Sequence, residues 1–274
     1  MRRIMSINPT IEISVQMFEF QKRFWWMLSS LCEQKTWQEN PVPKIIITAS
    51  VLSISDRYKS LTQGLIDTFS GHLDLRVKEY ASEQDFGLRG ALRTNDLKET
   101  EADWMFFTDA DMLFHPEFFS EMSANHIDNW KGLGTLITGP RLTTDKQVAC
   151  NFVDSFDYNC KKSVDNAFEK CLTINTGYSK RGRSPGAGYF QLVEVEYLKN
   201  NNINYCDRCR DASLFSTDGS GGRFVSDIMF RQKMNGITCM RKKIDKSGSR
   251  DILKPIMHLN HWRQNDKEWT NRGN

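Results

Sequence analysis

The stretch WMFFTDADMLF, residues 104–114, places four apolar residues before a threonine and two closely spaced carboxylates, then returns to apolar side chains. An apolar run of this length predicts a strand that is buried on both faces, as in a parallel sheet. Ligands of such sheets bind beyond the carboxyl ends of the strands, where Asp109 and Asp111 would emerge. Two neighbouring carboxylates repel each other unless a positive charge lies between them. The stretch therefore predicts a site for a hard divalent cation that carries a phosphate.

Length and composition indicate an ordinary globular α/β chain. The 274 residues suit one large domain or two small ones. Hydrophobic residues make up 39% and charged residues 26%, which is typical of a soluble protein with a sizeable core. The formal charge of +3 is too small to indicate a nucleic-acid partner, although it suits a ligand that bears phosphate.

The expected location is the cytoplasm. No apolar run approaches the roughly 20 residues that a transmembrane helix needs. The first residues, MRRIMS, lack the long apolar core of a signal peptide. Peripheral contact with a membrane surface stays open.

The chain has seven cysteines, an odd number, so at least one is unpaired, and in a reducing compartment free thiols are expected. Cys206 and Cys209 have the spacing of half a zinc site. The other half would come from Cys150, Cys160 or Cys171, which lack the paired spacing of a zinc ribbon.

Hydrophobic periodicity predicts an amphipathic helix over about 14–33, as part of an N-terminal helical extension spanning 1–40. The prolines within 41–43 then mark the entry to the main domain, 41–274. Strands and helices alternate from there, which predicts a mostly parallel central sheet with helices on both faces. The expected strands are 44–50, 73–80 and 104–108, and the expected helices are 57–69 and 88–99. A short helix should follow from 116 to 122.

Beyond residue 130 the pattern is weaker. Strands are expected at 134–138, 147–153, 186–193 and 256–261, with a helix at 224–234. The polar segment 155–185 reads as a loop or lid.

The order of these pieces resembles the inverting glycosyltransferases of the GT-A fold, most closely the family 2 type. The similarity covers about residues 44–263 and is strongest at 90–95, 102–104, 109–111 and 116–119. It implies a GT-A (nucleotide-diphospho-sugar transferase) fold, with a nucleotide-sugar-binding half at 41–125. Residues 126–274 would then form the acceptor-binding and catalytic half.

The resemblance also implies roles for particular residues. Asp111 would contact a metal ion directly, and Asp109 would contact the metal through water or the ribose. Asp227 matches the catalytic base. His261, with His258 in reserve, matches the late histidine of the metal site, which favours Mn²⁺ over Mg²⁺ because magnesium prefers oxygen ligands. His115 is a weaker alternative. Donor contacts are expected at Ser50, Asp56, Glu79, Arg93, Asp109 and Asp111.

The resemblance implies a metal-dependent glycosyltransferase that moves a sugar from a nucleotide-diphosphate sugar to an acceptor hydroxyl, with inversion. Family frequency favours UDP as the nucleotide, and the acceptor could be a glycan, a lipid-linked molecule or a protein. A non-catalytic nucleotide-sugar-binding protein and a sugar nucleotidyltransferase are the alternatives. Phosphatases of the haloacid-dehalogenase type are disfavoured, because Leu113 stands where they carry threonine or valine.

Overall fold

The computed structural model describes residues 8–53, 55–81, 86, 89–178, 188–206, 227, 229–240, 254 and 256–260. The strands of the larger sheet are β1 (Thr10–Phe18), β2 (Lys44–Leu52), β3 (Asp74–Tyr80), β4 (Trp104–Asp109), β6 (Thr135–Thr138), β9 (Gln191–Glu194) and β10 (Gly236–Cys239). Those of the smaller sheet are β5 (Met112–Phe114), β7 (Arg141–Thr144), β8 (Asn175–Tyr178) and β11 (Ile256–His258). The helices are α1 (Gln21–Cys32), α2 (Asp56–Phe69), α4 (Arg89–Glu99), α5 (Phe118–Met122), η1 (Ser123–Ile127), α6 (Asp128–Trp130), α7 (Lys146–Asp154), η2 (Tyr158–Cys160), α8 (Ala167–Leu172) and α9 (Val195–Asn200).

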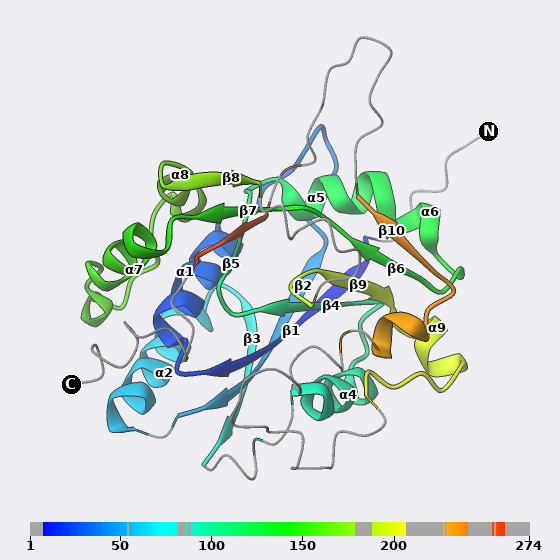
Figure 1. The fold of residues 1–274 in the computed structure, drawn as a ribbon, viewed down its shortest axis with the longest axis horizontal. Coiled ribbons are helices and arrows are strands. Elements are labelled where there is room, and N and C mark those ends of the chain that lie inside the picture. Colours follow the sequence, from blue (N-terminus) through cyan, green and yellow to red (C-terminus); the bar gives the residue numbers. More distant parts are fainter. Residues whose placement is uncertain are drawn as a thin grey trace.

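The larger sheet has the strand order β10-β6-β9-β4-β1-β2-β3, and the smaller has β5-β11-β7-β8 (Figure 1). β1 pairs in parallel with both β2 and β4, and β2 pairs in parallel with β3. β9 runs antiparallel to β4. The carboxyl ends of β1 to β4 therefore meet at one edge, which is the edge that parallel α/β sheets use for ligands.

Two apolar clusters cover the two faces of this sheet. The first joins β1 and β4 to α1 and α2, and includes the buried aromatic rings of Phe24, Trp25 and Phe106. The second joins the opposite face of β4 to α4 and α9, through Phe107 and Leu97. Helices thus lie on both faces, as the alternation of elements predicted (Figure 1).

The expected helix over 14–33 is correct only from Gln21 to Cys32, because residues 10–18 form the central strand β1. Apolar side chains alternate along this strand at Ile11, Ile13, Val15 and Met17, and all are buried. An alternation with a period of two indicates a strand. Met17 also lies at helical spacing from the aromatic residues that follow, so the sequence favoured a helix over the whole segment. The segment 1–40 is therefore not only a helical extension, since it supplies a strand to the main sheet. The division of the chain at residues 40 and 125 stays a prediction.

The intervening residues of β1 carry a buried polar face toward α4. Glu12 accepts hydrogen bonds from Thr48 on β2 and from Thr100 after α4. Ser14 donates to Asp96 of α4 at 2.7 Å. Buried polar groups persist where such partners are present, so these bonds fix α4 against the sheet.

The other elements predicted before residue 140 and the strand β11 are confirmed near the expected bounds, including the short helix α5 and the strand β6. The strand expected at 186–193 begins only at Gln191, as β9, and the helix expected at 224–234 is helical at its described residues 227 and 229–232, while 224–226 and 228 lie outside the described residues. The expected strand at 147–153 is wrong, because residues 146–154 form helix α7. Asp145 caps this helix by accepting a hydrogen bond from the Val148 amide at 2.9 Å. The expected loop at 155–185 contains α8 and β8 among its described residues. No helix in the described ranges has the length and apolar composition needed to cross a bilayer.

Candidate functional site

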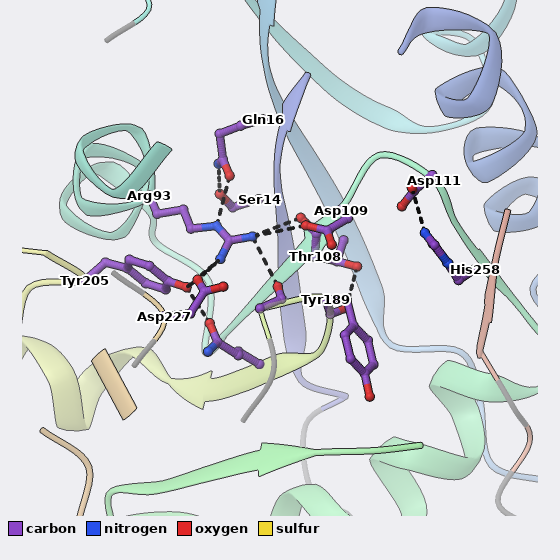
Figure 2. A network of polar contacts seen from close by, with 12 residues as sticks. Ser14, Gln16, Arg93, Thr108, Asp109, Asp111, Tyr189, Tyr205, Asp227 and His258 are labelled. Carbon is purple, nitrogen blue, oxygen red and sulfur yellow. Dashed lines mark hydrogen bonds and ion pairs between the residues drawn. The ribbon is translucent and has the colours of Figure 1, made fainter. Parts of the chain in front are cut away.

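The two carboxylates of the 104–114 stretch lie where β4 ends and β5 begins. Asp109 is the last residue of β4, and its side chain keeps 31% exposure. Asp111 lies in the turn before β5 and is almost fully buried. Their carboxylates face different partners, Asp109 toward Arg93 and Asp111 toward His258 (Figure 2). Both therefore emerge at the predicted ligand-binding edge of the sheet.

The Asp111–His258 pair joins the turn after β4 to the late strand β11. Nε2 of His258 lies 3.0 Å from a carboxylate oxygen of Asp111. β11 runs antiparallel to β5 and sets His258 opposite Met112, and the Leu259 amide donates to the Asp111 carbonyl. Of the two histidines predicted for the metal site, His258 contacts Asp111, whereas His261 lies outside the described residues.

The chemistry of this pair fits Mn²⁺, which accepts both carboxylate oxygen and imidazole nitrogen. Within the described ranges, no group of three or more histidine, cysteine, aspartate or glutamate side chains is placed to hold a metal ion. Among the described residues, Asp111 and His258 would therefore be the protein ligands of the ion. Asp109, the last residue of β4, lies two positions before Asp111. A bound diphosphate would supply further oxygen ligands.

Arg93 of α4 is the centre of the second part of the site. Its side chain is fully buried, and Nε donates to Gln16 at the end of β1 at 2.9 Å. Nη2 donates to the carbonyls of Thr108 and Gly188, at 3.1 and 3.2 Å, and lies 3.8 Å from Asp109. One guanidinium thus ties the ends of β1 and β4 to the segment that precedes β9.

Asp227 completes this arrangement from the opposite side of Arg93. A carboxylate oxygen of Asp227 accepts a hydrogen bond from Nη1 of Arg93 at 3.1 Å. The same oxygen contacts the hydroxyl of Tyr205, which also lies 2.6 Å from Gln191. Figure 2 shows Arg93 between Asp227 and Tyr205 on one side and Asp109 on the other. We call Gln16, Arg93, Asp109, Tyr205 and Asp227 the Arg93 network.

Gly188 permits the close approach of Asp227. A Cβ added at this position would lie 2.0 Å from a carboxylate oxygen of Asp227, well inside the closest contact that real Cβ atoms make. Any side chain at this position would therefore displace Asp227 or the chain segment before β9.

The remaining predicted donor contacts lie apart from this network. Ser50 is fully buried on β2, opposite Gln16 in the strand pairing. Asp56 starts α2 with a fully exposed side chain, and Glu79 is exposed on β3. Among the described contacts, none joins these three side chains to Arg93. Their roles in donor binding stay predictions, as does a direct donor contact by the fully buried Arg93.

The described contacts of His115 are a backbone hydrogen bond and ring packing, and they do not place it as a metal ligand. Its Nδ1 accepts a hydrogen bond from the Glu117 amide at 3.1 Å, and its ring packs edge-on against Phe168. Burial, with a smaller contribution from Lys254, lowers the pKa of His115 to about 4. The ring therefore stays neutral at physiological pH and serves the packing of the turn after β5.

The zinc alternative is not supported at Cys206. This sulfur is disulfide-bonded, whereas zinc requires a thiolate, and Cys209 lies outside the described residues. Cys150, Cys160 and Cys171 are free, as expected, whereas the disulfide at Cys206 departs from the expectation of free thiols.

Sequence reasoning missed Gln16, Gly188, Gln191 and Tyr205. Gln16 could have been found from the alternation along β1, because the last polar residue of a central strand emerges at the ligand-binding edge. Gly188 lies in the glycine-containing entry to the predicted strand at 186–193, but a glycine alone does not reveal the side chain that approaches it. Tyr205 has no local motif, and only its contacts with Arg93 and Asp227 identify it.

The fold is similar to that of solved glycosyltransferase structures. Residues 1–349 of S. aureus TarS match with a TM-score of 0.52 and 15% identity, over 85% of this chain and 58% of that one. The TarS complex with UDP-GlcNAc matches with a TM-score of 0.54 and 14% identity, over 94% of this chain and 60% of that one. This chain therefore spans less than two thirds of the length of either structure. No family model and no curated protein matches the sequence. At these identities the likeness concerns the fold, and the chain has the GT-A-like fold that the sequence resemblance predicted.

Proposed function

We propose that this protein is a metal-dependent glycosyltransferase that transfers a sugar from a UDP-sugar to an acceptor hydroxyl with inversion. One observation carries the proposal. The predicted donor-side acid Asp109 and the predicted base Asp227 come from distant parts of the chain, yet both contact the same buried guanidinium of Arg93. Buried polar clusters at the carboxyl edge of a parallel sheet are typical of ligand and catalytic sites.

The donor diphosphate requires neutralisation as it leaves. Asp111 and His258 would hold a Mn²⁺ ion, with Asp109 contacting the ribose or the ion through water. His261 remains a candidate ligand. When bound, the ion would act as a Lewis acid on the phosphate oxygens. The imidazole of His258 favours Mn²⁺ over Mg²⁺, because magnesium prefers an all-oxygen shell.

The acceptor requires a base, and Asp227 fits this role. Its carboxylate would take the proton of the acceptor hydroxyl while that oxygen bonds to the anomeric carbon. The bond between the anomeric carbon and the diphosphate oxygen breaks in the same displacement, and UDP leaves with the electron pair. A general base contributes typically about 10²- to 10⁴-fold to such a step. A single displacement inverts the anomeric centre.

UDP is the first nucleotide to test, because the TarS fold is solved with UDP and with UDP-GlcNAc. The acceptor class stays open between a glycan, a lipid-linked molecule and a protein. A nucleotidyltransferase or a non-catalytic binder would also bind nucleotide at this edge, so binding and turnover must be measured separately.

Thermal unfolding with UDP, GDP and CDP, each with and without Mn²⁺, tests the donor site. A ligand at about 100 times its Kd adds about 2.7 kcal/mol of stability, which raises Tm by several degrees. The expected result is a rise with UDP that needs Mn²⁺ and disappears in Asp111→Ala. A protein whose Tm responds to none of the nucleotides would not be a nucleotide-sugar transferase.

A further inference from the structure

The contacts of Tyr205 extend beyond packing. Its hydroxyl accepts a hydrogen bond from Nη1 of Arg93 and contacts the carboxylate of Asp227. The side chain of Tyr205 is fully buried, so water does not compete for these bonds. Because the hydroxyl has one proton, it can donate to only one acceptor at a time. The Asp227 carboxylate is a stronger acceptor than the neutral amide oxygen of Gln191, so the proton points to Asp227.

The ring of Tyr205 holds the same segment by a second contact. It stacks on Phe230 with a centroid distance of 4.4 Å and an interplanar angle of 21°. Asp227 and Phe230 are both helical and lie three residues apart, hence on one side of a helix. Tyr205 therefore contacts both the carboxylate of Asp227 and the helix turn that carries it.

The two oxygens of Asp227 have different surroundings. Oδ1 takes the hydrogen bonds of Arg93 and Tyr205. Oδ2 lies closest to the Cβ position that Gly188 leaves empty. The carboxylate is thus held by one oxygen, while its side chain as a whole retains 17% exposure.

We propose that Tyr205 is a positioning residue that orients the base Asp227, fixing Oδ1 so that Oδ2 takes the proton of the acceptor hydroxyl. This inference rests on the proposed function, because it assigns a task to the residue that supports the base. Arg93 fixes the orientation of Tyr205 by donating a hydrogen bond to its hydroxyl. Misplacing a reacting group by about 1 Å can cost about 10²-fold in rate, so orientation alone gives a measurable effect.

Tyr205→Phe tests this assignment, because it removes the hydroxyl and keeps the ring that stacks on Phe230. The assay is release of UDP from UDP-GlcNAc with Mn²⁺, with water as acceptor, and it yields kcat and KM. We expect kcat to fall about 10- to 100-fold while KM stays within about twofold. Tyr158→Phe is the matched control, since the Tyr158 hydroxyl donates to the Val153 carbonyl and none of its described contacts reaches the Arg93 network. Tyr158→Phe should leave kcat unchanged.

A double variant separates positioning from general support of the fold. If Tyr205 acts only through Asp227, adding Tyr205→Phe to Asp227→Asn should lower kcat no further. Independent losses that multiply in the double variant, or an unchanged kcat in Tyr205→Phe, would overturn the inference and leave the proposed function intact.

A crystal structure of Tyr205→Phe tests the orientation of Asp227 without an activity assay. If the wild-type protein releases no UDP, the proposed function fails, but the orientation of Asp227 can still be observed. The inference requires that Asp227 leave its contact with Arg93 in Tyr205→Phe and keep it in Tyr158→Phe. An Asp227 that stays in place in both variants would refute it.

Discussion

The Arg93 network and the Asp111–His258 pair both lie beyond the end of β4, but they are built differently. The network gathers residues from β1, α4, β4 and two later segments around one fully buried guanidinium. The pair joins two side chains across neighbouring strands. The network is thus held together by bonds within the fold, whereas under the proposed function the pair would also bind a metal ion and a diphosphate.

The strongest test of this contrast is removal of the guanidinium. Arg93→Met removes the guanidinium that donates to Asp227, Gln16 and two carbonyls, so we expect a loss of about 3–5 kcal/mol of stability and of most turnover. Arg93→Lys should recover only part of either, because one ammonium cannot reproduce the planar set of donors. Chemical denaturation measures the stability change.

Arg76→Met is the control for Arg93→Met, because Arg76 makes an exposed ion pair with Asp74 at 3.5 Å. Exposed pairs contribute less than about 1 kcal/mol. If Arg93→Met were no more destabilising than Arg76→Met, the network would not be a preorganised part of the fold.

The pair should show a smaller loss in the protein alone and a larger effect on ligand binding. His258→Ala removes a largely buried partner of Asp111, so we expect a loss of about 1–3 kcal/mol without ligand, and loss of the rise in Tm of several degrees expected with UDP and Mn²⁺. His115→Ala is the matched control, because it removes a nearby histidine that bonds the Glu117 amide. Retention of the full Mn²⁺-dependent rise in His258→Ala would show that His258 is not a ligand.

Gly188→Ala probes the space between the network and the strand β9. The added Cβ meets Asp227 at 2.0 Å, so we expect a loss of about 1–3 kcal/mol and a lower kcat with donor affinity retained. Gly71→Ala is the control, since nothing lies within 4 Å of its added Cβ. Equal activity of the two variants would mean that Asp227 need not stay against residue 188.

The smallest expected effect concerns His115 and pH. Its pKa is lowered to about 4 by burial, while an unfolded histidine titrates near 6.5. The unfolded chain therefore binds the proton first, and stability should fall as the pH drops from about 6.5 to about 4. We expect about 1–2 kcal/mol, less than the shift alone implies because the ring is half-buried. Denaturation of His115→Asn across this range should lack that component, and an identical pH dependence would contradict the assignment.

The sequence predicted those parts of the fold and the site that depend on a single local pattern. The apolar run of β4 and the carboxylates after it predicted the strand and the sheet edge at which both carboxylates lie, and ligand binding at that edge stays a prediction. The alternation in residues 10–18 was equally local, but the aromatic residues after it share a helical spacing, which concealed the central strand β1. The assembly of Arg93, Tyr205 and Asp227 depends on contacts between residues more than 100 positions apart, and no local pattern encodes such contacts.

The central claim is that Asp227 is the base of a sugar transfer, and Asp227→Asn tests it most directly. Kinetics of UDP release from UDP-GlcNAc with Mn²⁺, together with calorimetric binding of the same donor, would compare this variant with the wild type. The account expects kcat to fall about 10²- to 10⁴-fold with donor affinity within about twofold of the wild type. An Asp227→Asn protein that turns over at the wild-type rate would contradict it.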